Sequence, residues 1–376
     1  MNTTTPSNPA IPPTAGAAPD AARQAAPVPV PAPAGSPPPP AGRSALVLGA
    51  TGGIGGAVAR RLLAAGWQVK ALHRAPAGRA PLGPRFSWVA GDAMHRDDVL
   101  RAADGVSLIV HAVNPPGYRD WDKLVLPMID NSIAAARRSG ARIVLPGTVY
   151  NYGPDVFPDI GVDAAQRPLT RKGAIRVELE RRLELAAADG VRSLIVRAGD
   201  FFGPGAANNW FSQGLVKPGR PLRVVNNPGR AGVGHQWAYL PDVAETICRL
   251  VAIEQRLDHF ARFHMDGHWD ADGTRMAATV AHLAAGAGAG RLAVKPLPWW
   301  LLTLAAPFVP TLREMREMRY LWQQPVRLSN RRLLEVLGAE PRTPLEQAVR
   351  ATLDGLGCLP PDGTALATPM RDQACP

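Results

Sequence analysis

The chain has 376 residues, of which 46% are hydrophobic and 19% are charged, and its formal net charge is +11. This is the composition of a globular protein with one large or two modest domains. Because the arginines are scattered and aromatic residues do not interleave with them, the charge argues against nucleic-acid binding and suits a phosphorylated cofactor, an acidic substrate or simply a solvated surface.

The three cysteines, Cys248, Cys358 and Cys375, lie too far apart for a CxxC metal or redox motif. Their odd number also argues against a disulfide framework. The chain opens with Met-Asn-Thr-Thr-Thr and lacks a basic start followed by an apolar core, so we expect no secretory signal. These observations predict a cytoplasmic protein.

Residues 1–43 form a segment rich in proline and alanine that contains 13 of the 39 prolines and no Leu, Phe, Trp or Tyr. Such a segment cannot bury enough apolar surface to offset the entropy of ordering, which predicts a disordered tail. The folded part is expected to begin at Ser44, where a short apolar run ends in glycines, as a buried parallel strand does.

From Ser44 onward, strand and helix patterns alternate, which is typical of a parallel sheet with helices on its faces. The expected strands are residues 45–48, 68–72, 86–89, 106–111, 142–145 and 192–197. The expected helices between them are residues 53–65, 97–103, 123–139 and 169–188. This order predicts an α/β fold, a Rossmann-type doubly wound parallel sheet over residues 44–200.

After Gly199 the pattern loosens into segments rich in Gly, Asn and Pro. We expect residues 201–357 to form a small C-terminal substrate-binding region, interleaved with the Rossmann core, and residues 358–376 to form a flexible tail. Short helices are expected there at residues 242–253, 275–285 and 344–355. No internal repeat is present, which excludes solenoid and propeller folds.

Residues 297–310, with the sequence LPWWLLTLAAPFVP, are the most membrane-like part of the chain. This run is too short to span a bilayer and is interrupted by prolines, so we expect no integral membrane span. We favour a proline-bounded core helix or a dimer contact over the alternative, an apolar lid or a patch on a membrane surface.

The strongest local signal is the sequence GATGGIGG, which follows the first expected strand and opens the first expected helix. Glycines allow the tight turn and let backbone N–H groups approach a pyrophosphate, whose charge the helix N-terminus favours. In this context the motif predicts dinucleotide binding. The cofactor-binding residues expected from it are Gly49, Thr51, Gly52, Gly53, Ile54 and Gly55.

The end of the second expected strand distinguishes the two nicotinamide cofactors. An NAD site usually carries an acidic residue there, which binds the ribose 2′-hydroxyl. This chain instead reads Ala-Leu-His73-Arg74, and the planar guanidinium of Arg74 suits a 2′-phosphate. We therefore hypothesise NADP(H) as the cofactor, with NAD(H) as the alternative.

With these motifs in the same order, residues 44–357 resemble the extended short-chain dehydrogenase/reductases, also called the NAD-dependent epimerase/dehydratase family. The family's GxxGxxG pattern matches Gly49, Gly52 and Gly55. The resemblance implies an adenine contact at Asp92 and places Ala112 and Asn114, in the segment HAVNP, beside the nicotinamide ribose. The segments RAGDFFGP, from residue 197, and HQWAYLPD, from residue 235, resemble the family's later motifs.

The catalytic part departs from the family pattern, which is Ser or Thr followed by Tyr-x-x-x-Lys. Thr148 matches the hydroxyl residue, but Lys172 stands where Tyr belongs and Arg176 where Lys belongs. Three interpretations stay open: Lys172 is the proton donor, its pKa lowered by burial and by Arg176; Tyr150 or Tyr152 is the acid while Arg176 holds the cofactor ribose; or the site binds the nucleotide without turnover.

We therefore expect an NAD(P)-dependent oxidoreductase or epimerase-like enzyme acting on a small-molecule substrate, namely a carbonyl, an alcohol or a sugar nucleotide. The rival is a catalytically silent NADP(H)-binding sensor or scaffold. A homodimer through the helices after the fourth and fifth strands is left open, and no metal site is expected, because the acids and histidines of residues 264–272 do not fit a calcium loop. A sugar-nucleotide diphosphate would suit four basic residues of the later region, Lys217, Arg220, Arg223 and Arg230.

Overall fold

The structure is a computed structural model that describes residues 42–115, 120–206 and 209–359 together with Met1. Most of the two predicted tails, at residues 1–43 and 358–376, lies outside the described residues. Cys358 is buried, so the folded region extends past the predicted boundary at residue 357.

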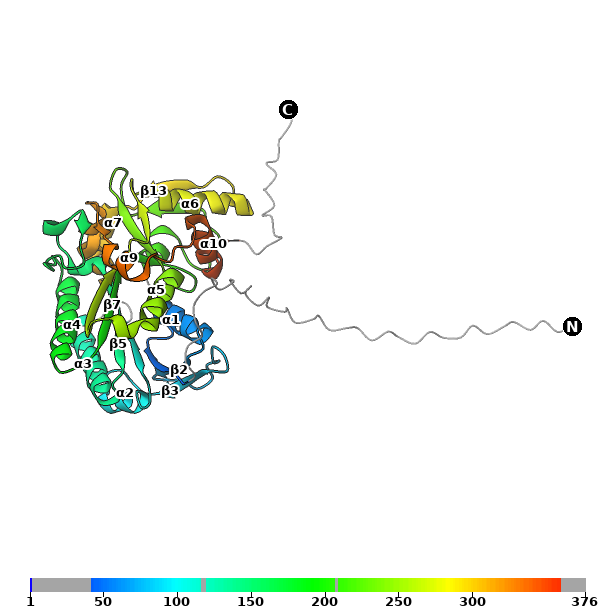
Figure 1. Ribbon diagram of the computed structural model, residues 1–376. Coiled ribbons are helices and arrows are strands. Elements are labelled where there is room, and N and C mark those ends of the chain that lie inside the picture. The colour runs from blue at the N-terminus through cyan, green and yellow to red at the C-terminus, as the bar shows by residue number, and fades with distance from the viewer. Residues whose placement is uncertain (2–41, 116–119, 207–208, 360–376) are drawn as a thin grey trace, which may run out of the picture. The chain divides into compact units, whose positions relative to one another are not determined.

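A seven-stranded sheet forms the centre of the fold (Figure 1). Its strands lie in the order β11-β7-β5-β4-β1-β2-β3, and every neighbouring pair is parallel. This is the order of doubly wound dinucleotide-binding sheets with one strand added at an edge, and it confirms the predicted fold class. The strands are β1 Ser44–Leu48, β2 Gln68–His73, β3 Phe86–Ala90, β4 Leu108–His111, β5 Arg142–Thr148, β7 Ser193–Ala198 and β11 Phe260–His264.

The added strand, β11, is absent from the six predicted strands. It pairs with β7 from Phe260 opposite Ser193 to His264 opposite Arg197. Its alternation of apolar residues with Arg262 and His264 is too short to be distinguished from a loop in the sequence. The Rossmann sheet is thus completed by a strand from residues 201–357, the range in which we expect the substrate-binding region.

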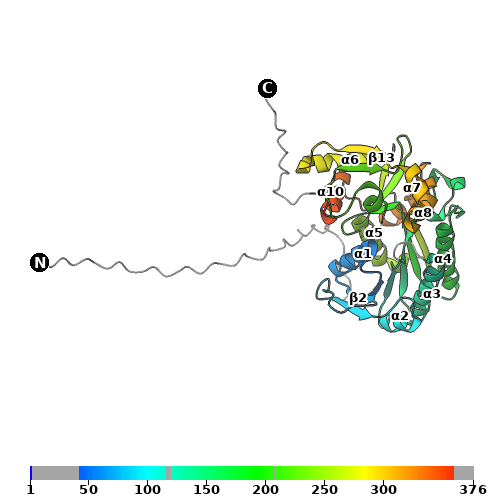
Figure 2. The ribbon, with the colours of Figure 1, turned by 180° about the vertical axis from the view of Figure 1, so that it is seen from behind.

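Helices cover both faces of this sheet (Figure 2). Helices α1 (Gly53–Ala64) and α5 (Leu240–Ala252) pack together on one face, and their apolar side chains share a core with β1 and β7. Helices α2 (Arg96–Ala102), α3 (Trp121–Ser139) and α4 (Arg171–Ala188) cover the other. The carboxyl ends of the strands therefore form an edge between two helical layers, where ligands of this fold class bind.

The later region adds three small sheets and a third core rich in aromatic residues. Their strands are β8 Asp200–Phe202, β9 Val224–Asn227, β10 His235–Tyr239, β12 His268–Asp270, β13 Ala293–Pro296 and β14 Arg327–Leu328, together with β6 Asp159–Ile160 from the segment between β5 and α4. Its helices are α6 Arg275–Ala284, α7 Trp299–Ala305, α8 Pro310–Glu317, α9 Arg331–Leu337 and α10 Leu345–Gly355. The three short helices predicted from the sequence correspond to α5, α6 and α10.

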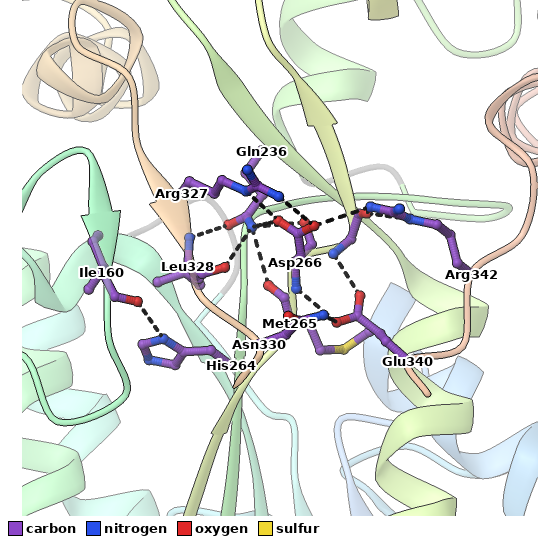
Figure 3. Close-up of polar contacts among 11 residues, drawn as sticks. Ile160, Gln236, His264, Met265, Asp266, Arg327, Leu328, Asn330, Glu340 and Arg342 are labelled. Carbon is purple, nitrogen blue, oxygen red and sulfur yellow. Dashed lines mark hydrogen bonds and ion pairs between the residues drawn. The ribbon is translucent and has the colours of Figure 1, made fainter. Parts of the chain in front are cut away.

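A polar network connects residues 327–342 to the segment that follows strand β11 of the central sheet (Figure 3). The Asp266 carboxylate, just after β11, accepts hydrogen bonds from Arg327 Nε at 2.7 Å and Nη2 at 3.0 Å. The carboxylate of Glu340 accepts the backbone N–H groups of Asp266 and Gly267 at 2.9 and 2.7 Å. Because an Arg–carboxylate pair with two hydrogen bonds fixes geometry as well as charge, this network holds the C-terminal segment against the sheet.

Candidate functional site

The turn between β1 and α1 is made of main chain packed against main chain. Gly49 has a φ of +89°, and a Cβ there would lie 2.5 Å from the carbonyl oxygen of Ala112 at the end of β4. A Cβ at Gly55 would lie 2.2 Å from the carbonyl oxygen of Gly49. Only glycine fits at these two positions, so the first turn of α1 stays close to the ends of β1 and β4.

The N-terminus of α1 opens into a pocket of about 590 Å³ at the carboxyl ends of β1 to β4. No acidic residue stands in the first turn of α1, so its backbone N–H groups and dipole favour an anion at this point. Of the predicted cofactor residues, Gly55 lies within the turn, and the others all line the pocket: Gly49, Thr51, Gly52, Gly53, Ile54, Arg74, Asp92, Ala112 and Asn114.

The far wall of this pocket comes from residues that the sequence did not single out. Phe201, Ala206 and Leu240 line it, and a Cβ at Gly53 would lie 2.8 Å from the Cβ of Ala206. These residues stand in or beside the segments RAGDFFGP and HQWAYLPD. The resemblance of those segments to family motifs was the available signal, although it did not say which side chains face the cofactor.

Two predicted residues sit where the adenosine half of a dinucleotide would lie. Arg74 follows β2, is exposed and lines the pocket. Asp92 follows β3, and its Oδ1 accepts the N–H of Met94 at 3.0 Å. β2 ends at His73, and Arg74 follows directly, so no acidic residue stands at this point. This part of the pocket therefore offers a cation where a ribose-binding carboxylate usually stands.

Beyond the residues that line the pocket, β5 leads through the short 3-10 helix η2 (Val149–Asn151) toward the start of α4. Thr148, the last residue of β5, accepts the backbone N–H of Tyr150 on its Oγ1 at 3.4 Å. A Cβ at Gly173 would lie 2.4 Å from the carbonyl oxygen of Tyr150. The first turn of α4 therefore packs directly against η2, which brings Thr148, Tyr150 and Lys172 into one neighbourhood.

Lys172 and Arg176 form a basic face on α4. The Lys172 ammonium lies 5.8 Å and the Arg176 guanidinium 5.2 Å from the ring centroid of Trp121. Lys172 is only 4% exposed. Arg176 Nη2 donates to Asn114 Oδ1 at 3.0 Å, and Asn114 lines the pocket. The position aligned with the family lysine is thus joined by one hydrogen bond to the part of the pocket lining that follows β4.

Tyr152 lies away from this neighbourhood. It is fully buried, and its hydroxyl lies 2.9 Å from His264 Nε2. Arg197 Nη1 donates to the same nitrogen at 3.0 Å, and Arg197 is itself paired with Glu180. Burial raises the pKa of Tyr152 and lowers that of His264 to about 3. Because its proton is held in a buried network, Tyr152 has a structural role here, and the interpretation of Tyr152 as an acid does not fit the geometry.

The hydroxyl of Tyr150 takes part in a polar chain that the sequence did not reveal. It donates to Asp200 Oδ1 at 3.4 Å, while His235 Nε2 contacts Asp200 Oδ2 at 2.9 Å. The His235 ring stacks on Trp322 at 3.7 Å between centroids. The contact of His235 with Asp200 forms because β8 and β10 are paired, which no local pattern in the sequence predicts.

The four basic residues considered for a diphosphate, Lys217, Arg220, Arg223 and Arg230, are all exposed, and none lines the nucleotide pocket. The segment with the acids and histidines of residues 264–272 forms β12 and a turn into α6. Asp270 accepts the backbone N–H groups of Arg275 and Met276 at the start of that helix. Within the described ranges, no three His, Cys, Asp or Glu side chains form a metal-binding group.

Comparison with known proteins bears on the same part of the chain. Residues 49–199 match the family model described as NAD(P)H-binding. This range contains the glycine-rich turn, β2 to β5, α4 and most of the pocket lining. Among curated proteins, no sequence matches this chain.

Solved structures with the same fold include enzymes that carry a nicotinamide cofactor. MoeE5 in complex with UDP-glucose and NAD superposes with a TM-score of 0.63 at 17% identity, over 84% of this chain and 98% of that one. A putative epimerase from Burkholderia cenocepacia J2315 gives 0.63 at 19%, over 85% and 99%. The UDP-glucose 4-epimerase of Thermus thermophilus, in complex with NAD, gives 0.61 at 20%, over 83% and 98%. The TM-scores establish a common fold, and at identities this low they establish the fold alone.

Proposed function

We propose that this chain, an NAD(P)H-binding protein with the fold of the extended short-chain dehydrogenase/reductases, is an NADP(H)-dependent oxidoreductase that acts on a small carbonyl or alcohol substrate. The observation that carries the proposal is the hydrogen bond from Arg176 to Asn114, because it connects the basic face of α4 to the nucleotide pocket.

The pocket suits a dinucleotide on steric and electrostatic grounds. The absence of side chains at Gly49 and Gly55 leaves backbone N–H groups at the α1 N-terminus accessible to a pyrophosphate. When bound, the nicotinamide supplies or accepts a hydride, and the protein has to position the substrate and manage one proton.

We assign these tasks to three residues. Arg176 holds the nicotinamide ribose, as its contact with Asn114 favours. Lys172 donates the proton to the carbonyl oxygen, because it stands in the first turn of α4, which packs against η2, one helical turn from Arg176. Thr148, at the end of β5, orients that oxygen. Tyr150 is the competing donor, but its hydroxyl is directed to Asp200.

The preference for NADP(H) rests on Arg74. A guanidinium at the end of β2 pairs with a 2′-phosphate and gains nothing from a free ribose hydroxyl. The sugar-nucleotide alternative for the substrate draws support from the UDP-glucose named for MoeE5. It draws none from the four exposed basic residues, which do not line the nucleotide pocket.

The test is NADPH oxidation by purified protein against a panel of aldehydes, ketones, quinones and UDP-sugars, followed by Lys172→Met. We expect this variant to lose activity by about 10²–10⁴-fold while its NADPH affinity stays the same. Lys123→Met is the matched control, because Lys123 is an exposed lysine on α3. Equal activity of the two variants would contradict the assignment of Lys172.

The silent sensor is the second candidate, and one observation favours it: Lys172 is almost fully buried and is not part of the pocket lining. Tight NADPH binding without oxidation across the panel would favour this candidate. Activity that survives Lys172→Met and disappears in Tyr150→Phe would move the acid to Tyr150.

A further inference from the structure

The segment from β13 to the start of α8 exposes large apolar side chains that usually lie in a core. Trp300 is 68% exposed, Leu304 is 65% and Phe308 is 86%, and Leu301 and Val309 are exposed beside them. No residue of α7 is buried. The prediction of a core helix for residues 297–310 is therefore wrong: proline-bounded apolar runs look the same in the sequence whether they are covered or not.

The helix is nevertheless anchored on its inner side. The Trp299 indole donates from Nε1 to the carbonyl oxygen of Pro228 at 2.8 Å, and its ring lies 5.9 Å from that of Trp210. The Arg319 guanidinium lies 5.4 Å from the centroid of the Trp299 ring. Because Trp299 is fixed in this way, Trp300 and the following leucines are presented outward by a docked helix.

The surroundings of this helix are basic. From Gly273 to Arg313 the chain contains no Asp or Glu, while Arg291, Lys295 and Arg313 are exposed. A second cavity, of about 460 Å³, lies between α8 and the start of α4, and its lining consists of Arg171, Arg313, Arg316 and Glu317. An apolar surface bordered by cations fits a partner that is apolar within and anionic outside.

We propose that α7 and the adjoining Pro307–Val309 turn insert into the surface of an anionic phospholipid bilayer. Tryptophan and long apolar side chains enter the boundary of the acyl chains, while Arg291, Lys295 and Arg313 contact headgroup phosphates. No helix in the described part of the chain is long and apolar enough to cross a bilayer. The contact is therefore peripheral, and it is independent of the proposed reaction.

Charge complementarity favours a bilayer over a second copy of the chain. In a two-fold symmetric dimer the same patch faces itself, so the basic residues at its border would meet like charges. An anionic membrane instead attracts each lysine or arginine at its surface by about 1 kcal/mol. The α7 surface thus matches a lipid headgroup layer in both polarity and charge.

The experiment is flotation of the full chain with two kinds of vesicle, phosphatidylcholine alone and phosphatidylcholine with about one third phosphatidylglycerol. We expect binding to the anionic vesicles that weakens with added salt, and little binding to the neutral ones. The variant Trp300→Ser/Leu304→Ser/Phe308→Ser should lower the partition by at least about tenfold, because it removes apolar surface that would leave water.

The matched control is Leu82→Ser/Leu185→Ser/Leu334→Ser, which changes three exposed leucines elsewhere and should bind like the unaltered chain. Circular dichroism and thermal unfolding verify that each variant folds, so the result does not depend on enzyme activity. Three outcomes would overturn the proposal: no binding of the unaltered chain to anionic vesicles, equal loss in both triple variants, or a dimer in light scattering that only the α7 variant dissociates.

Discussion

The two ends of the site are built in different ways. The nucleotide end is built around consecutive residues, Gly49 to Gly55, whose main chain packs closely at the start of α1. The other end, which we propose to be reactive and call the reactive end, collects side chains from β5, α4, β8 and β10, such as Lys172, Asp200 and His235. A main-chain device is encoded locally and can be identified in a sequence, whereas a side-chain constellation depends on how distant segments pair.

Breaking the buried support of the reactive end should have the largest effect. Arg197 is fully buried, and Glu180 accepts its Nη2 at 2.6 Å and its Nε at 3.0 Å. Glu180→Gln leaves a buried guanidinium without a countercharge, so we expect a loss of about 3–5 kcal/mol in the free energy of unfolding.

Urea denaturation measures this loss, and Glu178→Gln is the control two residues earlier on α4. Glu178 pairs with Arg181 and Arg182 near the surface, where such pairs contribute at most about 1 kcal/mol. If the two variants lost the same free energy of unfolding, the buried pair of Arg197 and Glu180 would contribute no more to stability than a surface pair.

At the nucleotide end, adding a single methyl group should disturb both the stability of the fold and the binding of the cofactor. The Cβ of Gly55→Ala would overlap the Gly49 carbonyl, so α1 has to shift; we expect a loss of about 1–3 kcal/mol in stability and weaker NADPH binding. Gly161→Ala is the control, since nothing lies within 4 Å of a Cβ there. Differential scanning fluorimetry with and without NADPH reports both effects, and an unchanged response of Gly55→Ala would argue against a main-chain cradle.

A side-chain change at the same end should alter selectivity more than stability. Arg74→Gln removes the cation at the end of β2, so the Kd for NADPH should rise by about 10–100-fold while that for NADH stays nearly constant. Arg85→Gln, an exposed arginine just before β3, serves as the control. If both cofactors lost affinity equally, Arg74 would be a general anion contact with no part in selectivity.

The smallest expected effect is on the pH dependence of stability, and it concerns one buried histidine at each end of the site. Burial lowers the pKa of His111, at the end of β4, and of His264, under the reactive end, each to about 3. In the unfolded chain a histidine binds a proton below pH ~6.5, so the unfolded state gains protons first and stability falls as the pH decreases from there toward 3.

Each histidine should contribute about 1 kcal/mol to the loss between pH ~6.5 and ~5.5. The variants His111→Asn and His264→Asn, unfolded in urea at several pH values, should each show a shallower pH dependence than the unaltered chain. An unchanged slope in either variant would mean that its histidine is already protonated in the native state.

Much of the fold could be predicted from the sequence, because alternating strands and helices and the glycine turn at Gly49 are local patterns. The strand β11 could not, since five residues with two polar ones carry no clear period. The contact of His235 with Asp200 could not either, because it follows from the pairing of β8 with β10. The exposure of Trp300 could not be predicted, because it depends on whether another segment covers its helix. The composition of the helix carries no information about that.

The most direct test of the account is a fluorescence titration of the full chain with NADPH and with NADH. We predict saturable binding of both, with NADPH binding more tightly and Gly55→Ala weakening both. Equal or tighter binding of NADH would contradict the assignment of Arg74, and absence of binding to either nucleotide would contradict the central claim that the pocket at the end of β1 holds a dinucleotide.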